Sequence, residues 1–225
     1  MLNLKRVVSG LVLVSASTLA SATMVQLIGT NIIVEYDTST LGLFGAPTLT
    51  GDSLSWSPTS FLALVNRTGP GVTVDNKTST FAFTLTAKPG WMLNTATLVS
   101  EAGSFSKTGA NSLVSVFGDL KVTPLPGTTV LTSLLGSAAF TPGAVGTWGA
   151  SAPVISLAPG TTQALVSYRD QLVARVVGTG FASISKTSAS IDVAVSPIPE
   201  PETYALMLAG IAVVGFISRR RRVRG

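Results

Sequence analysis

Short runs of β-prone residues, separated by Gly and Pro, make up most of this chain and limit the folds open to it. The clearest run is residues 80–88, in which apolar and polar side chains alternate. A period of two is that of a strand with one buried face. We therefore predict a strand here, whose buried face is formed by Phe81, Phe83, Leu85 and Ala87.

Other segments have a similar composition and are bounded by turn residues. Gly29-Thr30-Asn31 interrupts residues 24–36, which predicts two strands or one bulged strand. Residues 124–159 are rich in Pro, Gly, Ala and Thr and are expected to hold one strand, near 129–135. The remaining expected strands are 61–65, 91–99, 112–117 and 120–123 around a Gly118-Asp119 turn, 162–177 and 181–195.

The last two expected strands are joined at Gly178-Thr179-Gly180, which predicts a β-hairpin. Many short strands without a convincing amphipathic helix are typical of all-β proteins. We predict a single antiparallel β-sandwich or jelly-roll-like domain over residues 23–196.

One segment has an alternative interpretation. Within residues 161–177, four apolar or aromatic side chains lie three to four residues apart, which is also the spacing of one face of a helix. These residues are Leu165, Tyr168, Leu172 and Val176. A helix therefore remains open here beside the predicted strand.

The N-terminal residues have the pattern of a secretory signal peptide. Lys5 and Arg6 precede an apolar stretch at 7–19, and Ala20-Ser21-Ala22 has the small-residue form of a cleavage site. Signal peptidase is therefore expected to recognise Ala20 and Ala22 and to remove residues 1–22. The alternative is an uncleaved anchor helix.

The C-terminal residues form a second targeting segment. Pro197, Pro199 and Pro201 predict an extended spacer that joins neither sheet nor helix. Residues 203–218 are uncharged and predict a transmembrane helix of roughly 24 Å, short for a bilayer but workable if flanking arginines snorkel. The positive-inside rule places the arginines that follow in the cytoplasm and the body outside. The predicted membrane stop is Arg219, Arg220, Arg221 and Arg222, with Arg224 beyond it.

Together, Pro199-Glu200-Pro201, the apolar run and the terminal arginines make residues 197–225 resemble the PEP-CTERM sorting signal of exported Gram-negative bacterial proteins. The resemblance implies that Pro199, Glu200 and Pro201 are recognised by an exosortase-like membrane protease that removes the tail. It also implies transient anchoring in the inner membrane, then a cell-surface or extracellular location. Proteins with such tails are associated with exopolysaccharide and biofilm matrix. An ice-binding protein C-terminal label is also attached to such tails and implies no antifreeze activity.

Charge and cysteine content restrict the partners of the body. The net charge of +5 arises at the two ends, because residues 23–196 contain eight basic and eight acidic side chains. A neutral body predicts no nucleic-acid partner, which would need a basic patch. The absence of Cys means that this exported domain is held without disulfides.

The residue content also argues against an enzyme. The chain has no His and no Cys, which removes Ser-His-Asp and Cys-His catalysis and most transition-metal sites. Gly51-Asp52-Ser53-Leu54 spells a lipase-like motif but lacks the histidine that its chemistry requires. We predict no catalytic residues, no metal and no cofactor. Glu35 and Asp37, two apart on an expected strand, leave a carboxylate-dependent glycan-active enzyme as the third hypothesis.

Aromatic side chains supply the second hypothesis, a carbohydrate-binding module of the matrix. Trp148, within Gly146-Thr147-Trp148-Gly149, is the candidate for an exposed sugar contact. The alternative is that the aromatics form the core, where they bury large apolar areas. The first hypothesis is a structural or adhesive protein of the surface or matrix, with exopolysaccharide as a partner.

Overall fold

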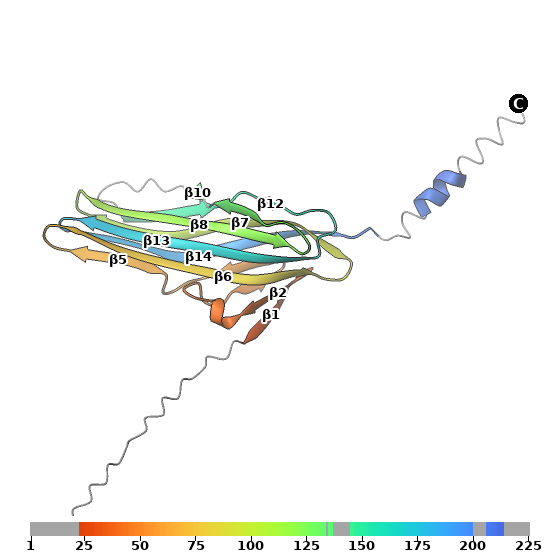
Figure 1. Ribbon diagram of the computed structural model, residues 1–225, viewed down its shortest axis with the longest axis horizontal. Helices are drawn as coiled ribbons and strands as arrows, with labels where there is room; N and C mark the ends of the chain where they lie inside the picture. The colour runs from red at the N-terminus through yellow and green to blue at the C-terminus, as the bar shows by residue number, and fades with distance from the viewer. Residues whose placement is uncertain (1–22, 134, 137–144, 200–205, 214–225) are drawn as a thin grey trace, which may run out of the picture.

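We describe the protein from a computed structural model, which describes residues 23–133, 135–136, 145–199 and 206–213. The body consists of antiparallel strands in two sheets that pack face to face, and the long strands run along the longest axis of the molecule (Figure 1). The all-β prediction is confirmed.

Within the described residues, one sheet is six-stranded. Its strand order is β1-β2-β6-β13-β8-β9, so β6, β13 and β8 occupy its centre. Its members are β1 (Met24–Ile28), β2 (Ile32–Asp37), β6 (Val72–Ala87), β13 (Gln163–Val177), β8 (Ser112–Pro124) and β9 (Val130–Ser133). A short 3-10 helix, η1 (Thr38–Thr40), follows β2.

The second sheet is eight-stranded over the same described ranges. Its main order is β10-β11-β7-β14-β4-β3, while β12 pairs with β7 and β5 pairs with β14. Its members are β3 (Thr48–Thr50), β4 (Ser53–Trp56), β5 (Leu62–Arg67), β7 (Trp91–Thr108), β10 (Leu135–Gly136), β11 (Val145–Ser151), β12 (Ile155–Ser156) and β14 (Gly180–Pro197).

Consecutive long strands alternate between the two sheets. The chain leaves β6 in the first sheet, enters β7 in the second and returns to β8 in the first. The same crossing joins β13 to β14, so Gly178-Thr179-Gly180 turns the chain from one sheet to the other. The predicted β-hairpin at this position is therefore wrong, because each strand finds its hydrogen-bonding partners elsewhere: β13 with β6 and β8, β14 with β7.

Several predicted strands are confirmed. The interruption at Gly29-Thr30-Asn31 separates β1 from β2, which pair as a short antiparallel ribbon. Residues 80–88 fall at the end of β6 but for Lys88, and the four predicted apolar residues are buried. The alternation of apolar and polar residues was therefore a sound guide to burial.

Two expectations are wrong, and one alternative is excluded. Residues 112–124 form one strand, because Gly118 and Asp119 lie opposite Asp170 and Arg169 of β13 within a continuous ladder. Residues 124–159 hold β9, β10, β11 and β12 rather than one strand. Residues 163–177 are a strand and not a helix, since the buried side chains occur at every second position. The exposed Leu165 lies on the opposite face from Tyr168, Leu172 and Val176.

The core lies between the sheets and is rich in aromatic rings. Trp56 lies 5.4 Å from Phe81 and 5.9 Å from Tyr168 between ring centroids, and Phe44 lies 4.9 Å from Tyr168. These rings come from both sheets and from the segment between β2 and β3. Aromatic rings therefore join the two layers at the centre of the sandwich.

A β-bulge in β14 keeps both halves of this strand facing the core. Lys186 pairs with Gly103 and Ser188 pairs with Ala102, so Thr187 is the extra residue. Before the bulge the buried residues are even-numbered, and after it they are odd-numbered. A bulge changes which side chains face inward. Without it, the apolar residues after position 187 would point into solvent.

Gly103 lets one aromatic ring cross over strand β7. Trp148 of β11 lies opposite Gly103, and its indole Nε1 donates a hydrogen bond to the Ser185 carbonyl of β14 at 3.0 Å. A Cβ atom at Gly103 would lie 2.5 Å from Trp148 Nε1 and 1.9 Å from the Ser185 carbonyl oxygen. Only glycine therefore fits at this position.

We predict that Gly103→Ala lowers the free energy of unfolding by about 1–3 kcal/mol, because the added methyl group displaces the indole and the neighbouring backbone. Gly149→Ala is the matched control, since its Cβ would meet only the Glu101 carbonyl at an ordinary 3.6 Å. Its effect should stay within about 0.5 kcal/mol. Urea unfolding of the two variants measures the difference, and equal stabilities would contradict the packing argument.

Candidate functional site

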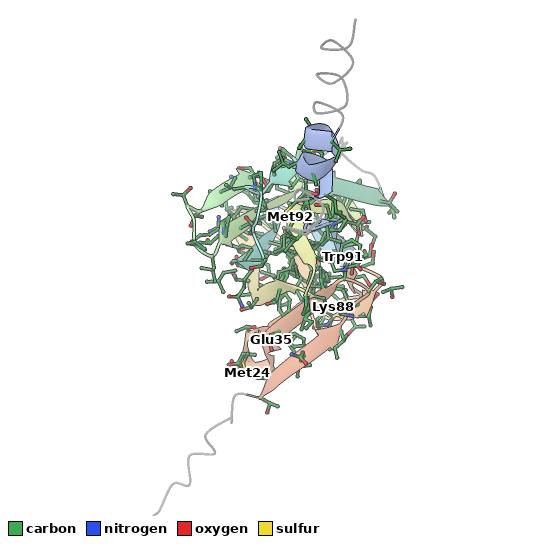
Figure 2. The ribbon with its side chains drawn as sticks, turned by 90° about the vertical axis from the view of Figure 1, so that its right-hand side faces the viewer. Met24, Glu35, Lys88, Trp91 and Met92 are labelled. Atoms are coloured by element: carbon green, nitrogen blue, oxygen red, sulfur yellow. The ribbon has the colours of Figure 1, made fainter. Side chains whose placement is uncertain are left out.

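The sorting segment begins as a direct continuation of strand β14. Ser196 and Pro197 are still paired with Met92 and Trp91 of β7, and the Ile198 amide donates to the Gly90 carbonyl at 2.8 Å. Figure 2 looks onto the end of the sandwich where Trp91 and Met92 lie. The Pro-rich spacer was predicted not to join a sheet, but Pro197 ends a strand and Ile198 is held by it. The sorting segment therefore begins within the sheet.

Most of the tail lies outside the described residues. Residues 206–213 are helical and exposed. Across the described segments no helix is both long enough and apolar enough to cross a membrane. The predicted helix at 203–218 is therefore described in part only. Further predicted sites lie outside the described residues: Ala20, Ala22, Glu200, Pro201, Arg219, Arg220, Arg221 and Arg222.

The prediction that Trp148 is an exposed sugar contact is wrong. Trp148 is 3% exposed and packs into the core over Gly103. Trp56, Tyr36 and Tyr168 are also buried, so the alternative interpretation, in which the aromatic side chains form the core, holds for these residues. The glycines on either side of Trp148 belong to strand β11.

Glu35 and Asp37 line a shallow groove on the outer face of the six-stranded sheet, with a volume of about 360 Å³. Figure 2 shows Glu35 beside Met24 on the side of the molecule formed by β1 and β2. Glu35 Oε1 accepts a hydrogen bond from Gln26 at 2.9 Å, and Asp37 Oδ1 accepts from the Ser39 amide at 2.8 Å. Lys121 also lines the groove. Both carboxylates already have structural partners, and Asp37 caps η1.

A cluster of charged side chains lies at the centre of the sandwich. Lys186 of β14 extends from one sheet, and Asp170 and Tyr168 of β13 extend from the other, while Glu101 comes from β7. Lys186 Nζ lies 2.5 Å from Asp170 Oδ2 and 3.0 Å from Glu101 Oε1. The side chains of all three ionisable residues are 0% exposed. We call Lys186, Asp170, Glu101 and Tyr168 the buried cluster.

Hydrogen bonds connect the other atoms of the buried cluster. Tyr168 donates to Glu101 Oε2 at 2.6 Å, and Lys186 Nζ donates to the Tyr168 hydroxyl. Asp170 Oδ1 accepts the Gln171 amide at 2.7 Å. Glu101 Oε1 has no hydrogen-bond partner among the described residues, although it lies within ion-pair distance of Lys186. One carboxylate oxygen thus faces the lysine without a fixed donor.

Aromatic rings enclose the lysine. Lys186 Nζ lies 4.7 Å from the centroid of the Tyr168 ring, 5.1 Å from that of Phe44 and 5.7 Å from that of Phe61. Ring faces attract a cation, but they also keep water away from it. The buried cluster therefore lies in a dry, low-dielectric space.

Burial changes the acidity of this cluster. Desolvation raises the pKa of Glu101 to about 7, opposed by the positive charge of Lys186 and supported by the negative charge of Asp170. Desolvation also raises the pKa of Tyr168 well above its usual range, and the two carboxylates add to this effect. Glu101 therefore exchanges a proton near neutral pH, whereas Tyr168 stays protonated.

The buried cluster was not predicted from the sequence. Its signal was present, because Lys186 continues the buried positions of Ala182 and Ile184, and Asp170 lies between Tyr168 and Leu172 on the buried face. A charged residue at an apolar position of a strand pattern indicates a buried ion.

We predict that Trp148→Ala lowers the free energy of unfolding by about 3–5 kcal/mol, because it leaves a large cavity in the core. Phe117→Ala is the control, since Phe117 is an aromatic residue that is 57% exposed. Its effect should stay within about 0.5 kcal/mol. Denaturant unfolding measures both, and an unchanged stability of Trp148→Ala would restore the exposed position that the sequence had suggested.

We also predict that stability falls as pH rises from about 4.5 to about 7, the interval between the unfolded and folded pKa of Glu101. In this interval the folded chain holds a proton that the unfolded chain has lost, so raising the pH favours unfolding. Glu101→Gln should flatten this part of the pH profile, as measured by urea unfolding at successive pH values. An identical slope in both proteins would contradict the raised pKa.

Comparisons with known proteins concern chiefly the tail. The model of the PEP-CTERM protein-sorting motif matches residues 197–222. No curated protein matches. Solved structures of infectious bursal disease virus are matched weakly: the Gt strain at 12% identity, 76% coverage of this chain and a TM-score of 0.21. The Gx strain matches at 10% identity, 77% coverage and a TM-score of 0.18. This chain spans 53% of either viral chain, and the likeness supports no inference.

The sorting motif gives the resemblance noted from the sequence a firm basis. It begins at Pro197, where the last strand of the body ends. It implies an exported, membrane-anchored precursor that an exosortase recognises and processes to the cell surface. The chain is therefore a PEP-CTERM sorting domain-containing protein.

Proposed function

We propose that this protein is a non-enzymatic structural or adhesive component of the bacterial surface or extracellular matrix, associated with exopolysaccharide. The observation that supports this proposal most strongly is the way in which the sorting motif is connected to the β-sandwich. A sorting motif for surface delivery continues directly from β14, an interior strand of a disulfide-free sandwich. The tail would therefore deliver a folded domain to which it is attached through β14, a strand that is hydrogen-bonded to neighbours on both sides.

The outer face of the eight-stranded sheet supports contact with a hydrated polymer. Hydroxyl groups from neighbouring strands face one another at 2.9 Å in three pairs: Ser104 with Ser185, Ser100 with Ser190, and Thr48 with Ser55. Hydroxyls donate and accept hydrogen bonds as sugar hydroxyls do. Such a face suits a polysaccharide-rich surrounding, and it offers Ser and Thr side chains for glycosylation.

The composition also favours a structural role over catalysis. The chain contains no His and no Cys, so the common nucleophile–base pairs are not available to it. Glu35 and Asp37, which had suggested a carboxylate pair, are engaged with Gln26 and Ser39. The buried cluster has no access for a substrate, because its ionisable side chains are fully buried.

We predict that the protein recovered from its own host begins at Thr23 and ends between Pro199 and Glu202, in the surface or medium fraction. Intact mass spectrometry of the inner-membrane, surface and medium fractions measures both ends, and added sugar mass would mark glycosylation. The physical reason is that the PEP triplet follows Ile198, whose amide is still hydrogen-bonded to the sandwich, so a cut at this triplet would leave the folded domain whole.

A matched pair of variants tests the role of the motif. Glu200→Ala should leave the full tail in place and hold the protein in the inner membrane. Glu202→Ala removes the neighbouring acidic residue outside the PEP triplet and should be processed as in the wild type. Wild-type protein that keeps residues 203–225 in the inner membrane would overturn the processing step and the matrix location.

A further inference from the structure

We propose that Lys186 and Asp170 become joined by an amide bond between their side chains, formed within the folded protein with Glu101 as the proton carrier. This cross-link is independent of the proposed function. It would connect β14 with β13, and thus one sheet with the other. The proposal rests on the geometry of the buried cluster.

The reacting atoms are already close together. Lys186 Nζ lies 2.5 Å from Asp170 Oδ2, the oxygen bonded to the carbon that an amine would attack. Reacting groups held at about 3 Å in a fixed orientation gain a large effective concentration over the same groups in solution. Both side chains are held by strands on opposite sheets, so packing of the sandwich brings them together.

The reaction needs both side chains in their uncharged forms. An ammonium and a carboxylate do not form an amide until a proton moves from nitrogen to oxygen. The side chains of Lys186 and Asp170 are 0% exposed, and three aromatic rings surround the lysine nitrogen. Neither side chain is in contact with bulk water, so the proton must move directly between the groups of the buried cluster. The same dryness protects the product from hydrolysis.

The reaction is a condensation that needs no oxidant and no cofactor. The Nζ lone pair of the neutral lysine attacks Cγ of the protonated Asp170, which forms the N–C bond and moves the C=O electron pair onto Oδ1. Nζ gives a proton to Glu101, and Glu101 gives a proton to Oδ2. The Cγ–Oδ2 bond then breaks and Oδ2 leaves as water. Amine and acid become amide and water, and Glu101 ends as it began.

Two contacts in the structure fit these steps. Glu101 Oε1 lies 3.0 Å from Lys186 Nζ and has no hydrogen-bond partner among the described residues, so it is placed to accept the proton. The Gln171 amide donates to Asp170 Oδ1 at 2.7 Å, where negative charge develops in the tetrahedral intermediate. A pKa of about 7 suits Glu101 for both taking and giving a proton near neutral pH.

Tryptic mapping of the full-length protein purified in its folded form tests the bond. Trypsin cuts after Arg169 and Arg175, which would normally release peptide 170–175, and it would also cut after Lys186. With the bond, peptide 170–175 stays attached to the peptide that begins at Val176, no cut follows Lys186, and the joined mass is lower by one water. Free peptide 170–175 of unmodified mass, with complete cleavage after Lys186, would overturn the proposal.

Two variants test the proton carrier. Glu101→Gln keeps the size of the side chain but cannot relay a proton, and the cross-linked peptide should be lost or reduced at least tenfold. Asp119→Asn is the control, because it removes a different carboxylate that pairs with Arg169 next to Asp170. It should keep the cross-link in full. A complete cross-link in Glu101→Gln would overturn the role of Glu101. The tryptic map of the wild-type protein shows whether the bond exists, even if a variant fails to fold.

Discussion

The interaction of Lys186 with Asp170 and Glu101 ties the two sheets together at a place that water does not reach. Removing such groups from water costs several kcal/mol for each ion, so they are stable inside only when all of them are together. Each group comes from a different strand, β14, β13 or β7. A shift of one residue in any of these strands would turn its charge outward and leave the others without a partner. The cluster thus fixes the register of the central strands.

The arrangement of strands places this interaction in the middle of the protein. Long strands cross repeatedly between the sheets, so that β13 and β14 face one another across the core instead of pairing side by side. The bulge at Thr187 lets Lys186 face inward while the apolar residues after it also face inward. Trp148 lies at the same level of the second sheet as Lys186, because both residues are paired with Gly103 of β7, one from each side. Packing, register and charge therefore support the same strand positions.

Sequence patterns predicted the all-β class, the break between β1 and β2, and the buried face of β6, because these depend on local alternation. They failed where distant pairing overrides local preference. Gly118-Asp119 has the composition of a turn, but Asp119 pairs with Arg169 of the neighbouring strand at 2.5 Å and the ladder continues through it. Trp148 was predicted to be exposed, but the space that its side chain fills is made by Gly103, which lies far away in the sequence. The buried cluster could not be predicted from local patterns, because its residues come together only when it is known which strands face each other across the core.

The attachment of the tail also determines how close the folded body stays to the membrane. Ile198 is the last residue whose backbone the structure shows bonded to the sandwich, and the apolar run begins at Thr203. A fully extended chain over this interval spans at most about 18 Å. If residues 203–218 enter the membrane as we propose, the end of the sandwich that carries Lys88, Gly90 and Trp91 would lie within about 18 Å of the lipid surface. A protease that cuts at the PEP residues would then work in the gap between the bilayer and the end of the sheet, so the width of that gap would limit release as well as the sequence does.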